Sequence, residues 1–265
     1  MSSFTILEED FIQLPEIIKR IHYCFRNKVG FSLVRIGDAE NQVLAQGSIY
    51  KNEEIKKIWW AENENWTGVV LPNYEARDIV IESVRKADIV GVLHQSEEFE
   101  WRNLTEAVFS IYDIKPRQLC YAFINTYMIN NPDLIALMEN HRVLLIGKAA
   151  PAFAYLLKTR FNINVSGAII INNYFEIPGV LEEASHFDYE MVLISAGSNA
   201  VILASALAQQ GKIAIDFGSA MNNNLWHFPL RQTIIESNSH NKSISARNYK
   251  ITNAFQFKNG SNELK

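Results

Sequence analysis

The chain has 265 residues, of which 48% are hydrophobic and 20% are charged. This composition is typical of a folded globular protein and excludes global disorder. With 25 basic and 29 acidic side chains the formal net charge is −4, and this slight acidic excess predicts no general attraction to nucleic acid.

Two cysteines, Cys24 and Cys120, lie far apart inside apolar runs. This pattern predicts buried free thiols in a reducing compartment rather than a disulfide framework or a cysteine metal site. The first residues lack the basic region and apolar stretch of a signal peptide, and no apolar run reaches the length of a membrane span. We therefore expect a cytoplasmic protein with no integral membrane segment.

Short apolar runs alternate with segments of helical periodicity along most of the chain. The predicted strands cover residues 31–36, 67–71, 88–93, 119–124, 142–146, 165–171, 189–194 and 212–215. The predicted helices cover residues 14–28, 53–60, 74–86, 97–112, 132–139, 151–160, 178–184 and 198–210. This alternation predicts an α/β fold with a Rossmann-like, doubly wound, mostly parallel sheet flanked by helices.

The composition changes near the end of the chain. From about residue 231 the sequence becomes polar and rich in Asn and Ser. We therefore expect one α/β domain over residues 1–230 and a loosely attached polar tail over residues 231–265.

The exit of the first predicted strand carries two acidic residues. Residues 31–36 are followed by Gly37, Asp38 and, two positions later, Glu40. In an extended backbone alternate side chains share a face, so both carboxylates would point at one site. At about 4 Å they would repel by on the order of 4 kcal/mol at an effective dielectric near 20, which favours Mn²⁺ or Mg²⁺ between them. Arg35 adds a fork-shaped donor for a phosphate held by such a metal.

The same acidic residues are also typical of a helix start. In this alternative, Asp38 caps a short helix over residues 41–46, and the helix dipole favours Glu40 in its first turn. The sequence alone leaves both interpretations open.

Two later strand exits carry further candidates, because ligands of open α/β sheets bind beyond the carboxyl ends of the strands. Gly147 and Lys148 follow one strand and would offer amides and a lysine to an anion. Gly197, Ser198 and Asn199 follow another strand, where Ser198 either caps a helix or contacts a phosphate oxygen. A tight strand-to-helix turn explains each glycine equally well.

Other polar residues near strand ends have weaker signals. Asp216 leaves the last predicted strand and either faces the same crevice or serves as a turn residue. Asn125, Asn172 and Asn173 also follow apolar runs and are first of all turn residues. The histidines show no metal-like spacing, so His94 is expected to be a surface or core residue. No Gly-x-Gly-x-x-Gly or Walker motif occurs, which disfavours a conventional dinucleotide site or P-loop.

Two segments together resemble the GT-D-type glycosyltransferases. Residues 31–40 read FSLVRIGDAE, and residues 194–218 read ISAGSNAVILASALAQQGKIAIDFG. The resemblance implies a Rossmann-like fold with an Asp-x-Glu motif, a nucleotide-sugar donor and a divalent metal. Asp38 and Glu40 would then bind Mn²⁺ or Mg²⁺ together with the diphosphate of the sugar nucleotide. The candidate nucleotide-sugar-binding residues are Arg35, Gly37, Asp38, Lys148, Gly197, Ser198 and Asn199.

The resemblance leads to a hypothesis of function. We expect a metal-dependent glycosyltransferase that transfers a hexose from a nucleotide-diphosphate sugar, a UDP-sugar in particular, to an unidentified glycan, protein or small-molecule acceptor. The metal would neutralise charge on the leaving diphosphate, with Lys148 or Arg35 assisting. Asp216 is the candidate base for the acceptor hydroxyl. The sequence leaves a homo-oligomer open.

Departures from the family pattern motivate an alternative. Ser219 stands where the family commonly has a histidine after its Asp-Ile-Gly motif, and no basic residue follows the strand near Phe123. A non-catalytic Rossmann-like nucleotide-binding or assembly protein would explain these losses. A methyltransferase with residues 142–147 as its cofactor strand is a weaker alternative, because the following loop lacks a second glycine.

Overall fold

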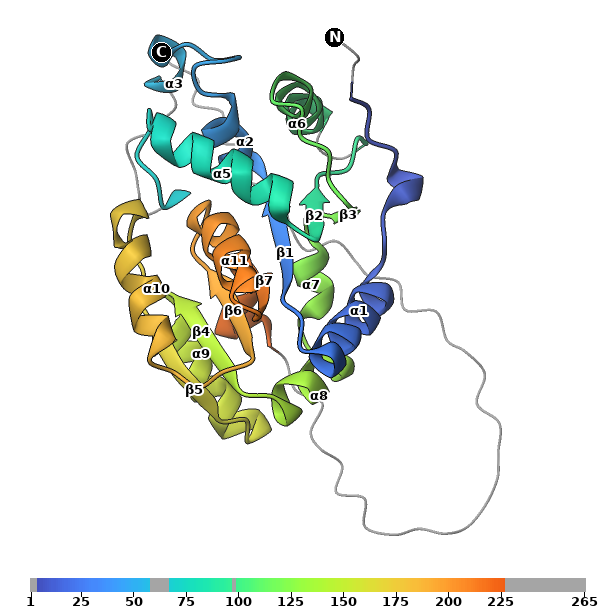
Figure 1. The fold of residues 1–265 in the computed structure, drawn as a ribbon, viewed down its shortest axis with the longest axis vertical. Coiled ribbons are helices and arrows are strands. Elements are labelled where there is room, and N and C mark those ends of the chain that lie inside the picture. Colours follow the sequence, from blue (N-terminus) through green and yellow to red (C-terminus); the bar gives the residue numbers. More distant parts are fainter. Residues whose placement is uncertain (1–3, 58–66, 97–98, 227–265) are drawn as a thin grey trace, which may run out of the picture. The chain divides into compact units, whose positions relative to one another are not determined.

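A computed structural model describes residues 4–57, 67–96 and 99–226 of the chain. Its centre is a sheet of seven strands in the order β3-β2-β1-β7-β6-β4-β5, and every neighbouring pair is parallel (Figure 1). The strands are β1 (Phe31–Ile36), β2 (Ile89–Val92), β3 (Leu119–Tyr121), β4 (Val143–Gly147), β5 (Val165–Ile169), β6 (Met191–Ser195) and β7 (Ile213–Asp216). The predicted Rossmann-like α/β fold is confirmed.

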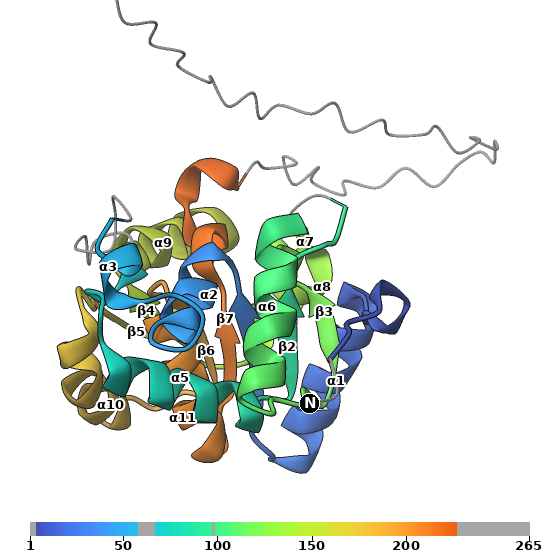
Figure 2. The ribbon, with the colours of Figure 1, turned by 90° about the horizontal axis from the view of Figure 1, so that it is seen from above.

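Helices cover both faces of the sheet, as Figure 2 shows. The helices that pack on one face of the sheet and share one hydrophobic core are α2 (Asp38–Ala45), α3 (Asn52–Ile55), α5 (Tyr74–Lys86), α6 (Phe99–Ile111), α10 (Ile177–Ser185) and α11 (Asn199–Gln209). The other core contains α1 (Leu14–Asn27), α7 (Ile124–Met128), α8 (Pro132–Asn140) and α9 (Ala150–Leu156). Strands enclosed on both faces must be apolar throughout, which explains why they appear in the sequence as continuous hydrophobic runs.

The first helix shows how local sequence sets these elements. Pro15 sits in the first turn of α1, where its missing N–H costs nothing. Ile17, Ile18 and Ile21 recur with helical spacing and are buried under the sheet. The helix ends at Lys28, whose φ of 54° is left-handed. Cys24 and Cys120 are both buried free thiols, as predicted.

Two predicted strands differ from the structure. Residues 67–71 form no strand, because Gly68 has φ +78° and the Thr67 hydroxyl bonds to both the carbonyl and the amide of Val69. Val69 and Leu71 are buried in the core that includes α2 and α5, whereas Val70 is exposed. The strand predicted over 119–124 ends at Tyr121, and the short helix α7 follows it.

The remaining predicted elements are present with shifted ends. The helix predicted over 53–60 is described only as Asn52–Ile55, and residues 58–66 lie outside the described part. The predicted polar tail and the boundary at residue 231 also lie outside it. No helix in the described part of the chain is both long enough and apolar enough to span a bilayer.

The chain order places a topological switch point between β1 and β7. The connections from β1 to β3 move outward on one side, whereas β6 and β7 return toward the centre on the other. Ligands of such sheets bind outside the carboxyl ends of the strands at this point. The exits of β1 and β7 are therefore the place to look for a site.

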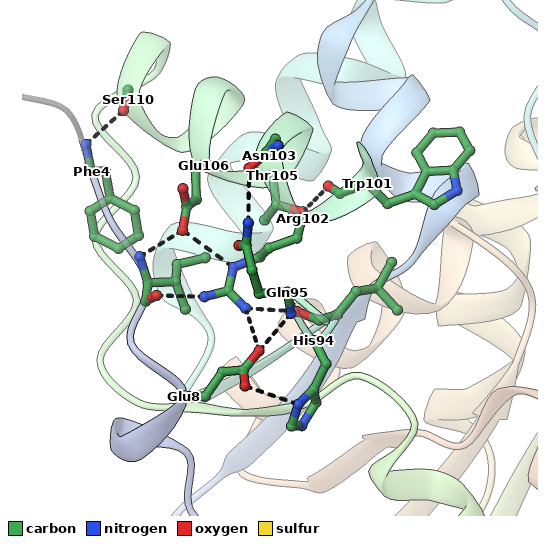
Figure 3. Close-up of polar contacts among 12 residues, drawn as sticks. Phe4, Glu8, His94, Gln95, Trp101, Arg102, Asn103, Thr105, Glu106 and Ser110 are labelled. Atoms are coloured by element: carbon green, nitrogen blue, oxygen red, sulfur yellow. Dashed lines mark hydrogen bonds and ion pairs between the residues drawn. The ribbon is translucent and has the colours of Figure 1, made fainter. Parts of the chain in front are cut away.

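A buried arginine fastens the N-terminal segment to this sheet (Figure 3). Arg102 of α6 is 1% exposed and donates to the carbonyls of Leu93 and Ile6 at 2.8 and 2.5 Å. Its guanidinium also faces the carboxylates of Glu106, at 3.3 Å, and Glu8, at 3.6 Å. One side chain thus joins α6, the exit of β2 and the segment that precedes α1.

Replacing Arg102 with Met is expected to lower the free energy of unfolding by about 2–3 kcal/mol, because two carboxylates lose a shielded cation. Urea denaturation measures this change. Arg117→Met is the control, since Arg117 is 64% exposed beside Asp88 and its loss should cost under about 1 kcal/mol. Equal losses in both variants would contradict the anchoring role.

Candidate functional site

A buried ion pair links β1 to β7 at the switch point. Nη2 of Arg35 lies 2.9 Å from Oδ1 of Asp216, and the two side chains are only 17% and 4% exposed. The Arg35 Nε also donates to the Asp216 carbonyl at 3.1 Å, and Nη1 donates to the Ala122 carbonyl at 3.3 Å. The guanidinium therefore ties together the exits of β7, β1 and β3.

Glu40 extends this cluster toward β6. Its Oε2 accepts the Gly37 N–H at 3.0 Å, and its Oε1 accepts the Ser198 hydroxyl at 3.0 Å. Glu40 lies in the first turn of α2, and Ser198 immediately precedes α11. The carboxylate thus bridges the exit of β1 and the exit of β6.

The cluster holds more negative than positive charge. The pKa of Glu40 is raised to about 7, mainly by burial and then by the Asp216 carboxylate, while Arg35 and the Gly37 N–H act in the opposite direction. Burial also raises the pKa of Asp216, against the effect of Arg35. Two shielded carboxylates share one guanidinium, so an additional cation would be stabilised here.

The predicted geometry of the acid pair is wrong. The helix α2 begins at Asp38, so Asp38 and Glu40 lie in one helical turn rather than on an extended strand. Two residues apart on a helix, their side chains diverge by about 200°. Asp38 is exposed, and its Oδ1 accepts the Ala39 N–H at 2.9 Å.

The alternative interpretation is partly confirmed. A helix does start here, but it starts three residues earlier than predicted and its N-cap is Gly37, not Asp38. Glu40 reaches back to the N-cap amide, which is the second half of a capping box. Its other oxygen binds Ser198, so the helix start accounts for only part of its contacts.

The loop after β6 is held by internal contacts. Gly197 has φ +55°, and a Cβ there would lie 2.5 Å from the carbonyl oxygen of Thr67. Ser198 makes no side-chain cap to α11, and its amide donates to the same Thr67 carbonyl. Asn199 is buried and donates to the Gly68 carbonyl at 2.9 Å. The structure brings this loop to the Arg35 cluster through Ser198.

Lys148 lies farther along the edge of the sheet. It follows β4, which is three strands from β1 in the sheet order, or about 14 Å at the usual strand spacing. Its side chain is exposed. The structure therefore sets Lys148 apart from the ion pair and from Glu40.

Gly218 is a site residue whose role is evident only in the folded chain. Its φ is +47°, and a Cβ there would lie 1.9 Å from Nη2 of Arg35. Beneath it Asn125, which is buried, donates to the Phe217 carbonyl at 3.1 Å and to the Ser219 hydroxyl at 3.4 Å. The only sequence signal was a glycine after an acidic strand exit.

In the described part of the chain, no three His, Cys, Asp or Glu side chains lie close enough together to hold a metal ion by themselves. Mn²⁺ and Mg²⁺ are commonly held by one or two carboxylates, with waters and substrate phosphates completing the shell. Glu40, whose carboxylate lies at the switch point, fits that kind of site, whereas Asp38 leaves α2 in a different direction.

The profile of the GT-D fold-like domain matches residues 12–224. The chain belongs to the GT-D-like family. It therefore has a glycosyltransferase fold, and the predicted family resemblance is confirmed. No curated protein gave a match.

Solved structures agree with the GT-D-like assignment at the level of the fold. A domain of unknown function 1792, described as having a distinct glycosyltransferase fold, is 14% identical with a TM-score of 0.55, over 82% of this chain and 80% of that chain. A protein described as a new glycosyltransferase of Streptococcus sanguinis is 17% identical with a TM-score of 0.51, over 79% of this chain and 82% of that chain.

Gly218→Ala is expected to displace the Arg35 guanidinium and to destabilise the fold by about 1–2 kcal/mol, because the new Cβ meets Nη2 and the backbone is left-handed. Thermal unfolding measures the loss. Gly179→Ala is the control, since Gly179 lies in α10 with open space around it and alanine favours a helix by about 0.5–1 kcal/mol. A stabilised Gly218→Ala variant would contradict the packing described.

Glu40→Gln is expected to stabilise the protein above neutral pH in the presence of a chelator. The folded-state pKa of about 7 exceeds the unfolded value near 4.5, so the wild type loses stability as pH rises through that window. The variant lacks this loss, and its advantage should grow to about 1–3 kcal/mol at pH 8. Urea denaturation from pH 4 to 8 measures it.

The control for this titration is Glu53→Gln, which changes an exposed acid in the first turn of α3. Its stability difference from the wild type should stay nearly constant across the same pH range. A constant difference for Glu40→Gln as well would show that Glu40 ionises normally.

Proposed function

We propose that this GT-D-like protein is a metal-dependent glycosyltransferase that transfers a hexose from a UDP-sugar to a hydroxyl-bearing acceptor. The observation that carries the proposal is the cluster of Arg35, Asp216, Glu40 and Ser198 at the switch point of a glycosyltransferase fold. A shielded excess of carboxylate beside a guanidinium suits a cation and a diphosphate together.

Glu40 and Asp38 are the residues that would hold Mn²⁺ or Mg²⁺. A bound divalent cation would neutralise charge on the departing diphosphate. Glu40 must lose its proton to bind it, and because its pKa is raised to about 7, binding of the cation would release a proton at neutral pH. Asp38 leaves α2 in a different direction, so it would add a second negative charge near the cation rather than share a face with Glu40.

The other candidates have distinct tasks in this proposal. Arg35 contributes fixed positive charge next to the diphosphate, and Ser198 orients Glu40. Gly37, Gly197 and Asn199 shape the loops around the donor, and Lys148 extends the site toward β4. The buried free thiols favour a reducing compartment, which supports the expected cytoplasmic location.

Asp216 remains the sequence-based candidate for the base. Its carboxylate is 4% exposed and paired with Arg35, so its evident task is to position the guanidinium. We propose this positioning role for Asp216, in which Asp216→Asn would weaken donor binding through Arg35.

The test is hydrolysis of UDP-glucose with and without Mn²⁺. Glu40→Gln and Asp38→Asn should each lower the Mn²⁺-dependent rate by about 100-fold, because each removes charge opposite the metal. Asp133→Asn is the matched control, since Asp133 is an exposed acid in the first turn of α8, and its rate should equal that of the wild type.

Calorimetry with UDP and Mn²⁺ separates this proposal from the non-catalytic alternative. Tight binding without turnover by the wild type would favour a non-catalytic nucleotide-binding protein. This alternative is based on Ser219, which stands where the family commonly has a histidine. Full activity in both acidic variants would remove Glu40 and Asp38 from the mechanism.

A further inference from the structure

A second polar site lies where β2 leaves the sheet. Nδ1 of His94 is 3.2 Å from Oε2 of Glu8, and the two side chains are 32% and 35% exposed (Figure 3). Glu8 comes from the segment before α1, almost a hundred positions away in the sequence. A carboxylate on one ring nitrogen of a histidine holds the proton there and leaves the other nitrogen as an acceptor.

The Glu8 carboxylate is held in place by the anchor described above. Its Oε1 accepts the Gln95 N–H at 2.5 Å and lies 3.6 Å from Nη1 of Arg102. Arg102 is itself fixed by the Leu93 carbonyl and by Glu106. The orientation of His94 is therefore set by a buried network rather than by an isolated surface pair.

The imidazole is also packed between aromatic rings. Its centroid lies 4.4 Å from that of Tyr121 and 5.5 Å from that of Phe11, both edge to face. Among the described residues, the titratable groups that contact it are Glu8 and Tyr121, and Arg102 and Glu106 lie behind Glu8. Within the described ranges its Nε2 has no hydrogen-bond partner, and 32% of the side chain is exposed.

His94 follows β2, the strand next to β1, at the same edge of the sheet as the Arg35 cluster. In the register, Ile36 pairs with Val92, so His94 leaves the edge beside the start of α2. Arg35 donates to the carbonyl of Ala122. Tyr121, the residue before Ala122, is the one whose ring meets His94.

We propose that His94 is the catalytic base for the acceptor, with Glu8 as its positioning residue. This inference rests on the proposed function. As the acceptor oxygen bonds to the anomeric carbon of the donor, its proton passes to Nε2 of His94. The bond from the anomeric carbon to the phosphate oxygen breaks, and its electron pair leaves with the nucleoside diphosphate. Glu8 stabilises the imidazolium that results.

The neighbouring surface suits a sugar as the acceptor. Phe123 follows β3, is 39% exposed, and packs edge to face on Tyr121 at 5.4 Å. An exposed aromatic ring beside a base is a good platform for the apolar face of a sugar ring. The acceptor hydroxyl would then approach from the β2 and β3 side, opposite the metal carboxylates.

The experiment measures Mn²⁺-dependent UDP-glucose hydrolysis, in which water replaces the acceptor, from pH 5 to 9. His94→Gln should lower kcat by about 100-fold while Mn²⁺-UDP affinity, from calorimetry, changes less than about twofold. His94→Ala should recover activity when imidazole is added. Glu8→Gln should lower kcat less and shift the acidic limb of the pH profile, which a purely structural role would not do.

The matched control is His141→Gln. His141 also faces a carboxylate, Glu190 at 3.7 Å, but it precedes β4 at the opposite edge of the sheet. Its variant should hydrolyse the donor at the wild-type rate. Thermal unfolding of each variant shows whether the fold is kept.

The outcomes separate the two proposals. Wild-type hydrolysis with an equally active His94→Gln would overturn the role of His94 and leave the glycosyltransferase proposal standing. A slow His94→Gln together with a His94→Ala that imidazole does not restore would also overturn it, because loss of packing explains that result. A wild type that neither binds Mn²⁺-UDP nor hydrolyses the donor would overturn both proposals.

Discussion

The site depends on one guanidinium that is shared between two carboxylates. Arg35 pairs with Asp216 at 2.9 Å, and Glu40 lies close enough for both charges to shift its pKa. In a shielded environment such charges interact far more strongly than in water. The arrangement is stable only if the guanidinium stays in place, which explains why a glycine must cover it at position 218.

This cluster can exist only at the edge of the sheet. Apart from Ser32 and the ion pair of Arg35 and Asp216, the strands β1 and β7 are apolar, and helices bury both faces. Within those faces an extra carboxylate would be prohibitively costly. At the carboxyl ends, backbone amides and the Ser198 hydroxyl satisfy the charges.

A second guanidinium repeats the pattern at the neighbouring strand. Arg102 also faces two carboxylates, Glu8 and Glu106, and is almost fully buried. In the function proposed here, the surplus charge of the first cluster binds a cation and, through it, a diphosphate. In the second cluster, Glu8 contacts Nδ1 of His94, and Nε2 of the same ring is the atom proposed to accept a proton. The two clusters divide the edge into a donor half and an acceptor half in the function proposed here.

The sequence by itself determined the fold class, most elements and the region of the site. Continuous apolar strands alternating with amphipathic helices have one common solution, a parallel sheet covered on both faces. Glycine and acidic residues at the exit of residues 31–36 marked the edge where polar groups gather. These signals are local, so one sequence is enough to detect them.

Tertiary structure alone decided which charges meet. Arg35 and Asp216 are 181 positions apart, and Ser198 and Glu40 are 158 apart, so no local pattern predicts their contacts. The pair of His94 and Glu8, 86 positions apart, could not be predicted from a local pattern either. The local pattern also gave the wrong geometry for Asp38 and Glu40, because their spacing fits a strand exit as well as a helix start. The N–H of Gly37 decides between them by bonding to Glu40 and starting the helix.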